Sequence, residues 1–356
     1  MIKKKRLPFG TVIVILAAVL ILACILSTTL GRYPISVWEL GGIAWNQVMK
    51  LVEQFGRWLG VDMPELRLEP FWTATQEALF LKHRVPRIAI ACMVGCSLST
   101  AGACYQGVFQ NPMAAPDILG ASSGAALGAS LAIIMGYTNA VIGGMAFVFS
   151  LATVTLVILV GNHARGNRVV GLILSGVMIS SLVSSGTSFI KLIADTEEQL
   201  PAITYWLMGS FNGAKLEDIL FAAIPMAIGL IPVFILRWRI NILSLGDDEA
   251  QTLGINAKRL RIIIIICSAL ITAASVAVSG IIGWVGLVIP HMARRVVGND
   301  YKKLIPATML FGAIFMLLVD NICRNVWATD LPIGILTSFV GAPFFIYLIM
   351  KEGDQL

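Results

Sequence analysis

The feature that most constrains this chain is a succession of apolar runs, most of them about 20 residues long, the length that crosses a bilayer as a helix. Lipid offers no hydrogen bonds, so each run must satisfy its own backbone groups, and a helix is the structure that does so. Spans are expected at roughly 9–30, 85–107, 114–135, 139–161, 168–194, 217–236, 260–282, 303–323 and 331–350, with a shorter partial helix at 284–297. The sequence therefore predicts an all-α polytopic membrane protein of about ten transmembrane helices, with residues 1–356 forming a single membrane domain.

Composition and charge agree with a membrane chain and orient it. Hydrophobic residues make up 57% and charged residues 13%, against about 25% charged in soluble domains. Lys3, Lys4, Lys5 and Arg6 precede the first span, which places the N-terminus in the cytoplasm, and the expected crossings return the C-terminus there. A cleaved signal peptide is the alternative for 1–30, but its apolar core is long and no clear cleavage site follows. The net charge of +6 reflects this topology, and no nucleic-acid partner is expected.

Residues 31–82 form the long external segment, and an apolar stripe runs through its first half. Its members recur at helical spacing: Trp38, Trp45, Val48, Val52, Phe55 and Leu59. Polar side chains occupy the rest of the helical wheel, so the pattern predicts an amphipathic helix. Such a helix lies either in the outer headgroup region or against the tops of neighbouring spans. The pattern does not choose between the two.

Small and hydroxyl side chains are concentrated in Gly120–Gly128 and Ser180–Ser188. Close helix packing is the simpler interpretation, because small residues let backbones approach in lipid. A hydroxyl-lined path is the functional interpretation, and it is stronger for 180–188, including Ser184, Ser185 and Thr187. Between two spans, Pro112 and Pro116 must stop the helix, and broken membrane helices often border a transport path.

A hydrophilic loop at 237–261 carries the start and stop signals of a short helix. Ser244 is expected to cap it, with Asp247 in a capping-box-like position and acidic side chains at its positive end. Ala250 and Leu253 give it an apolar side, Gly254 stops it, and Asn256 is expected to cap the next helix. A solvated linker is the alternative. The complete set of signals favours a rigid helix presented to a cytoplasmic partner as a coupling element. That element comprises Ser244, Leu245, Gly246, Asp247, Asp248, Glu249, Ala250, Leu253 and Gly254.

The motifs of nucleotide-binding loops, zinc proteases and serine hydrolases do not occur in the sequence. The 6 cysteines fall inside or at the ends of apolar spans and are interpreted as small buried hydrophobes, so no metal site is expected. Asp320 is the one acidic residue inside a span that suggests ion coupling. It lies one helical turn from Arg324, and a local salt bridge explains it.

Residues 83–350 resemble the permease subunits of the iron-siderophore, haem and cobalamin uptake family of ATP-binding cassette importers. The resemblance is carried by His83-Arg-Val-Pro-Arg87, Gln106-Gly-Val-Phe-Gln-Asn-Pro-Met-Ala-Ala-Pro-Asp117, Tyr205-Trp-Leu-Met-Gly-Ser210, Leu243-Ser-Leu-Gly-Asp-Asp-Glu-Ala-Gln-Thr-Leu-Gly254, Gly286-Leu-Val-Ile-Pro-His-Met-Ala-Arg294 and Gly341-Ala-Pro-Phe344. It implies the type II importer permease fold and a second permease subunit, expected to be an identical copy. It also implies a pair of ATPase subunits that bind ATP and Mg²⁺, an external substrate-binding protein, and the bacterial cytoplasmic membrane as location. This chain would then hold no cofactor and catalyse no reaction. The segment 31–82 is longer than the family pattern.

The resemblance also assigns roles to particular positions. Asn111 and Met113 match positions that narrow the cytoplasmic end of the path. Arg84, Arg87 and Arg324 match basic positions that receive glutamates of the binding protein. We expect a pathway subunit for a metal chelate, with an iron-siderophore first and haem or cobalamin next, and an oxyanion left open. The alternatives are an ion-coupled transporter acting alone and a membrane-embedded enzyme, and clustered catalytic residues for the latter are absent from the sequence.

Overall fold

The computed structural model of the chain describes residues 7–31, 33–58, 66–163, 168–327 and 329–352. In these ranges the regular elements are helices, and no strand occurs. Their bounds are α1 Phe9–Thr29, α2 Val37–Trp58, α3 Ala74–Leu79, the π-helix η1 Phe80–Arg84, α4 Val85–Val108, the 3₁₀ helix η2 Pro116–Leu119, α5 Ala121–Ile134, α6 Asn139–His163, α7 Arg168–Ile193, α8 Gln199–Leu207, α9 Leu216–Leu243, α10 Asp247–Thr252, α11 Ala257–Ser279, α12 Val285–Val297, α13 Tyr301–Asn325 and α14 Ile333–Glu352. The predicted all-α class is confirmed.

Within the described ranges, 7 helices are long and apolar enough to cross a membrane: α1, the continuous α3–α4 helix, α6, α7, α9, α11 and α13. Helices α5 and α14 are apolar but shorter. The expected number of crossings, about ten, stays a prediction: α5 and α12, with 14 and 13 residues, are shorter than a full span, whereas α14 has 20 residues.

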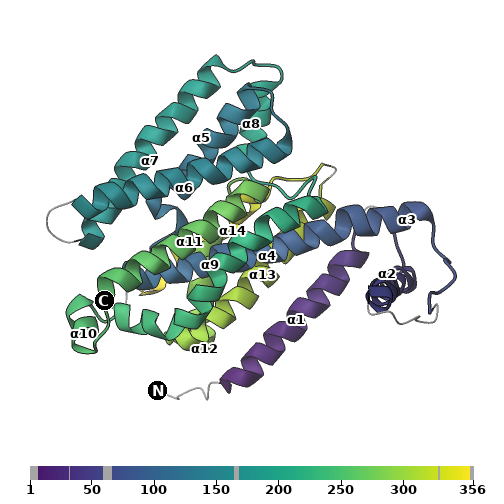
Figure 1. Ribbon diagram of the computed structural model, residues 1–356, viewed down its shortest axis with the longest axis horizontal. Helices are drawn as coiled ribbons and strands as arrows, with labels where there is room; N and C mark the ends of the chain where they lie inside the picture. The colour runs from purple at the N-terminus through teal and green to yellow at the C-terminus, as the bar shows by residue number, and fades with distance from the viewer. Residues whose placement is uncertain (1–6, 32, 59–65, 164–167, 328, 353–356) are drawn as a thin grey trace.

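Two groups of helices make up the molecule (Figure 1). One group contains α5, α6, α7 and α8; the other is built around α4, which packs against α9, α11, α12 and α13. Helix α1 packs along the outside of the second group against α13. Helix α4 is buried along most of its length, whereas α1 and α7 leave most of their surface exposed. Exposed apolar surface on spans of this kind is the surface that lipid or another subunit covers.

Glycines bring α4 into backbone contact with two of its neighbours. A Cβ atom added at Gly102 would lie 1.8 Å from the carbonyl oxygen of Gly286 on α12, and one at Gly95 would lie 2.2 Å from that of Gly312 on α13. In the other group, a Cβ atom at Gly128 on α5 would lie 2.4 Å from the carbonyl oxygen of Met145 on α6. Close packing is therefore what the stretch Gly120–Gly128 provides.

Two predicted boundaries are wrong. The span expected at 114–135 is divided, because Pro116 begins η2 and Gly120, with φ +76°, separates it from α5. The hydrophilic loop expected at 237–261 is shorter than predicted, because α9 continues to Leu243. The side chains of Ile240 and Leu243 are fully buried, so their packing extends the helix past the charged residues near its end.

The predicted external helix is α2, and its apolar stripe points away from the protein. Trp38, Val48 and Phe55 are exposed, whereas Asn46 and Glu53 on the opposite side are buried. Packing of the stripe against the tops of the spans is therefore wrong for the described residues; Leu59 lies outside them.

Candidate coupling, gating and docking sites

The coupling element consists of α10 and the short connections that join it to α9 and α11. The helix ends in two backbone hydrogen bonds, from Gly254 N to Gln251 O at 2.9 Å and from Ile255 N to Ala250 O at 2.9 Å. Gly254 has φ +73°, so the end has the bonding pattern of a Schellman motif with glycine in the left-handed position. The Asn256 side chain accepts from Arg259 N at 2.9 Å and caps α11. The predicted stop and the predicted second cap are confirmed.

The predicted first cap is wrong. Ser244 ends α9, and its hydroxyl donates to the carbonyl of Asn241 at 2.6 Å. Gly246, with φ +134°, occupies the N-cap position of α10, with no side-chain cap bond. The helix begins at Asp247, two residues later than a cap at Ser244 predicts. The side chains of Asp247 and Asp248 lie outside the described part of the structure.

The apolar residues of the coupling element face in two directions. Ala250 is fully buried among the core residues that join α9 and α11, while Leu245 is 63% and Leu253 is 59% exposed. Leu253 therefore does not share a side with Ala250, as the sequence predicts. With Glu249 also exposed, the outward surface combines apolar and acidic side chains. A protein partner that buries this surface needs apolar contacts for the leucines and a basic side chain for the Glu249 carboxylate.

Hydrogen bonds tie the end of α9 to both neighbouring cytoplasmic segments. Gln110 Nε2 donates to the carbonyl of Leu243 at 2.8 Å, with Gln110 itself in the left-handed region at φ +51°. Asn241 Nδ2 donates to Asp300 Oδ1 at 2.8 Å, and Tyr301 N donates to Asn241 Oδ1 at 2.8 Å. None of these contacts is predicted from the sequence. The sequence feature that could have indicated them is the presence of polar residues at the ends of apolar spans.

The gate segment begins immediately after Gln110. The side chain of Asn111 accepts from Met113 N at 2.9 Å, and Asn111 O accepts from Ala114 N at 3.1 Å. These bonds form a tight turn whose tip, including Met113, is exposed. Buried Ala114 and Leu119 anchor the turn at its return to the protein. One side-chain bond, from Gln110 to Leu243, therefore connects the end of α9 to the residue that precedes this turn.

The wall of the predicted path lies on α7. A cavity of about 300 Å³ opens beside it and is lined by polar side chains that include Asp117, Ser122, Ser184, Thr187, Ser188 and Lys191. Ser185 does not line this cavity. The hydroxyls of Thr187, Ser185 and Ser188 donate to carbonyls one turn earlier in the same helix, at 3.3, 3.0 and 3.1 Å. The partners that these hydroxyls need are therefore supplied by α7 itself.

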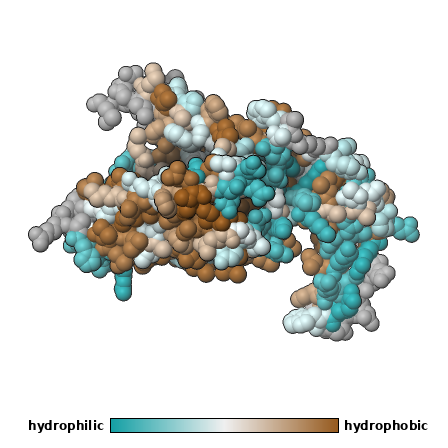
Figure 2. Space-filling model, turned by 90° about the horizontal axis from the view of Figure 1, so that it is seen from above, coloured by the Kyte–Doolittle hydropathy of each residue, from teal (hydrophilic) through white to brown (hydrophobic). Residues whose placement is uncertain are grey.

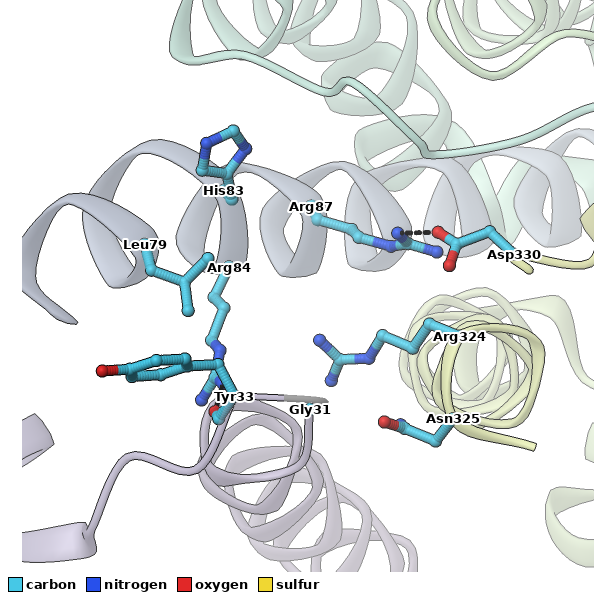
Figure 3. A pocket seen from close by; sticks show the side chains of 9 residues that line it. All are labelled: Gly31, Tyr33, Leu79, His83, Arg84, Arg87, Arg324, Asn325 and Asp330. Atoms are coloured by element: carbon cyan, nitrogen blue, oxygen red, sulfur yellow. Dashed lines mark hydrogen bonds and ion pairs between the residues drawn. The ribbon is translucent and has the colours of Figure 1, made fainter. Parts of the chain in front are cut away.

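The external arginines surround a second cavity, of about 240 Å³ (Figure 3). Arg87 binds both Asp320, with Nε to Oδ1 at 2.9 Å, and Asp330, with NH1 to Oδ2 at 2.7 Å. Arg324 lies 4.0 Å from Asp320. The primary partner of Asp320 is thus Arg87 on α4, so the predicted local pair with Arg324 is the minor contact.

Two of these arginines, Arg84 and Arg324, are buried. Arg84 is 5% exposed, and its guanidinium donates to the carbonyls of Thr28 and Tyr33. Arg324 is buried and donates to the hydroxyl of Ser27 at 2.7 Å. Buried arginine is retained where hydrogen bonds satisfy it. These bonds hold the end of α1 to η1 and α13.

The arrangement of a long buried α4, a broken hairpin after it and a short cytoplasmic helix between α9 and α11 can be compared with known proteins. The model of the FecCD transport family matches residues 12–351. The chain belongs to the FecCD transport family. It is accordingly an ABC importer permease, a non-enzymatic membrane subunit, as predicted. The alternatives of a lone ion-coupled transporter and of a membrane enzyme are excluded by this membership.

Individual relatives of this FecCD permease cover most of its length. It is 38% identical over 336 residues to the molybdate import system permease protein MolB of Haemophilus influenzae, covering 94% of each chain. It is 42% identical over 273 residues to the "Probable iron chelatin transport system permease protein" of Helicobacter pylori, covering 77% of this chain and 82% of the other. A solved inward-facing structure of a metal-chelate type ABC transporter superposes with a TM-score of 0.82 at 36% identity, covering 96% of this chain and 99% of that one.

Proposed function

We propose that this permease forms half of the membrane path of an importer for a metal chelate, with an iron-siderophore as the first candidate. The observation that carries the proposal is the wall of α7. Its hydroxyls already donate to their own helix, so they present a polar surface with little capacity to bind cargo tightly. A path lined in this way suits a large polar chelate that passes through without binding tightly. The name of the Helicobacter pylori relative, an iron chelatin permease, supports this substrate class.

A second permease subunit closes the path in this proposal, and we expect it to be an identical copy. Helix α7 leaves most of its span unburied, and Phe339 on α14 is 75% exposed. The exposed side of α7 lies beside the cavity described above, and the exposed side of α14 belongs to the last helix. In this proposal a second copy of the permease covers these surfaces and forms the other wall of the path. Because exposed small residues such as Ser181 and Ser185 interrupt the apolar α7 surface, two helices can approach closely there.

A pair of ATPase subunits, which would bind the ATP and Mg²⁺, is proposed to receive the coupling element in a groove on each. The outward side chains Leu245, Glu249 and Leu253 would enter that groove. Closure of the ATPases then moves α9, and the bond from Gln110 to Leu243 carries the movement to Asn111 and Met113 at the gate. This path needs no acidic relay in the membrane, in agreement with the pairing of Asp320 by Arg87.

An external substrate-binding protein is proposed to load the path from the opposite side, with both termini of the permease in the cytoplasm and the bacterial cytoplasmic membrane as its location. Arg84, Arg87 and Arg324 line one cavity with Asp330. Together with Asp320, the acidic residues leave one positive charge uncompensated at this external mouth. Glutamates of the binding protein would pair with that charge. Such pairing orients the binding protein and speeds its association more than it raises the affinity.

The test is uptake by the complete transporter in proteoliposomes, with its ATPase inside and its binding protein outside. Radiolabelled ferric siderophore, haem, cobalamin and molybdate are supplied separately. ATP-dependent accumulation of a ferric chelate is expected. The second candidate is molybdate, because the MolB relative aligns with 94% of each chain. Accumulation of molybdate alone contradicts the chelate proposal in favour of this candidate.

A further inference from the structure

Helix α2 is attached to the protein by a side that carries the buried polar residues Asn46 and Glu53 and, nearer its start, the buried apolar residues Leu40 and Ile43. Asn46 makes a reciprocal pair with the backbone of Leu68, with Nδ2 to O at 2.9 Å and N to Oδ1 at 2.8 Å. Glu53 forms an ion pair with Arg67, and Trp45 Nε1 donates to Leu66 O at 3.0 Å. A helix on a water-soluble domain normally buries its apolar side and exposes its polar side. Leu40 and Ile43 of α2 follow that rule and pack with Trp72 and Phe80, but the rest of its apolar residues remain exposed while Asn46 and Glu53 are buried.

The side of α2 that remains uncovered is apolar and rich in aromatic residues. Trp38 is 84% and Trp58 is 79% exposed, and the same side carries exposed Trp45, Val48, Leu51, Val52 and Phe55. A continuous exposed apolar surface of this kind marks a site of contact with a membrane or a partner. The polar side is already used by residues 66–68, so the apolar side is the one free to make that contact.

The position of α2 indicates which contact it makes. Figure 1 draws α1 along its length and α2 end-on, so α2 runs across the outer end of a transmembrane span. At that end of α1, Ile25, Leu26 and Leu30 are exposed and must face lipid. The apolar surface of α2 continues this lipid-facing surface. In Figure 2, the part of the molecule that contains α2 projects from the bundle, with hydrophilic side chains over much of the face in view.

We propose that α2 lies in the outer leaflet, along the boundary between headgroups and acyl chains, with its apolar side in the lipid. Tryptophan favours this depth because its ring is apolar and its N–H is polar. Trp45 shows the division directly, since its ring is exposed while its N–H is bonded to Leu66. The helix then rests on the membrane beside α1. It holds the connection that contains Tyr33, whose carbonyl accepts from Arg84, and so fixes the outer ends of α1 and α4 relative to the bilayer surface.

Nitroxide labels report this placement in the complete transporter, reconstituted in nanodiscs of phosphatidylethanolamine and phosphatidylglycerol. Single cysteines are introduced at Val48, at Phe55 and, as the control, at Gln54, which is exposed on the same helix outside the apolar stripe. The parent chain, labelled in parallel, supplies the background of the native cysteines. Labels at 48 and 55 are expected to collide at least several-fold more with oxygen than with a water-soluble nickel complex. The label at 54 is expected to show the opposite preference.

Equal access of the nickel complex to the labels at 48 and 55 overturns the proposal, because it places both sides of α2 in water. Protection that appears only after the external binding protein is added also overturns it, because the apolar side is then a protein-docking surface. If a variant fails to assemble, Leu51 on the same exposed side replaces that position, and the same comparison with Gln54 decides the result.

Discussion

The left-handed residue that ends α10 provides a test of coupling that separates backbone conformation from side-chain contact. Gly254 has φ +73°, and an added Cβ atom there would meet no other atom within 4 Å. Substitution therefore introduces no clash, and its effect comes from the backbone alone. A β-branched residue in this region costs about 1–2 kcal/mol or more, whereas asparagine tolerates it. Gly254→Val and Gly254→Asn are thus a matched pair.

A cost of about 1–2 kcal/mol shifts a two-state equilibrium by roughly 5- to 30-fold. Gly254→Val is expected to lower substrate uptake per ATP hydrolysed by a factor in this range, because the end of α10 no longer holds Leu253 in its docked position. Gly254→Asn is expected to remain near the parent value. The measurement is uptake and phosphate release in the same proteoliposomes, with assembly checked by size-exclusion chromatography. Equal coupling ratios in the two variants would refute the reasoning.

Further predictions concern the gate, the packing of α4, the buried ion pair and the hold on α2. A cysteine in place of Met113 is expected to cross-link between permease copies in one nucleotide state only, and state-independent cross-linking contradicts a gate. Gly102→Ala must separate α4 from α12 by about 1.2 Å or more and is expected to cost about 1–3 kcal/mol of stability; Gly144→Ala, with open space around it, is the control, and equal melting temperatures reject the packing argument. Asp320→Asn leaves a buried guanidinium with less compensation and is expected to cost about 3 kcal/mol, measured by thermal unfolding in detergent. The hydrogen bond from Arg67 lowers the pKa of Glu53 below its ordinary value of 4.5. The contribution of the Glu53–Arg67 ion pair to the attachment of α2 is therefore expected to be complete above that pH and to be lost as pH falls through the lowered pKa. Proteolysis of the connection after α2 that does not increase in acid argues against this.

The sequence predicts the helices well, because the spacing of apolar residues and the positions of proline and glycine are local signals. Gly254 and Asn256 are read correctly for the same reason, since each acts on the backbone within a few residues. The pairing of Arg87 with Asp320 joins positions more than two hundred residues apart and has no local signal. The sequence alone therefore indicates Arg324, one turn away, as the partner of Asp320.

The sequence also does not predict which side of α2 faces the protein, and the reason is different. Helical spacing places Trp38 and Phe55 on one side, but it does not say what covers that side. The polar residues Asn46 and Glu53 bind a segment that follows the helix, and only the folded chain reveals that attachment. Ser244 fails as a predicted cap for a related reason: burial of Ile240 and Leu243 extends α9, so the serine ends one helix and does not begin the next.

The glycine contacts of α4 have a consequence for how the permease can change shape. Where Gly102 meets Gly286 and Gly95 meets Gly312, main chain lies against main chain, and side chains pack beside both contacts, with Pro116 at Gly286 and Ser99 at Gly312. The Ser99 hydroxyl also donates to the carbonyl of Thr308 on α13 at 3.0 Å. A separation of α4 from α12 or α13 would break these contacts, so we expect the three helices to move together. We therefore expect the change of shape to occur at the border with α5 to α8 and at the surface of α7, where hydroxyls bonded to their own helix lie among exposed apolar side chains such as Leu182 and Phe189.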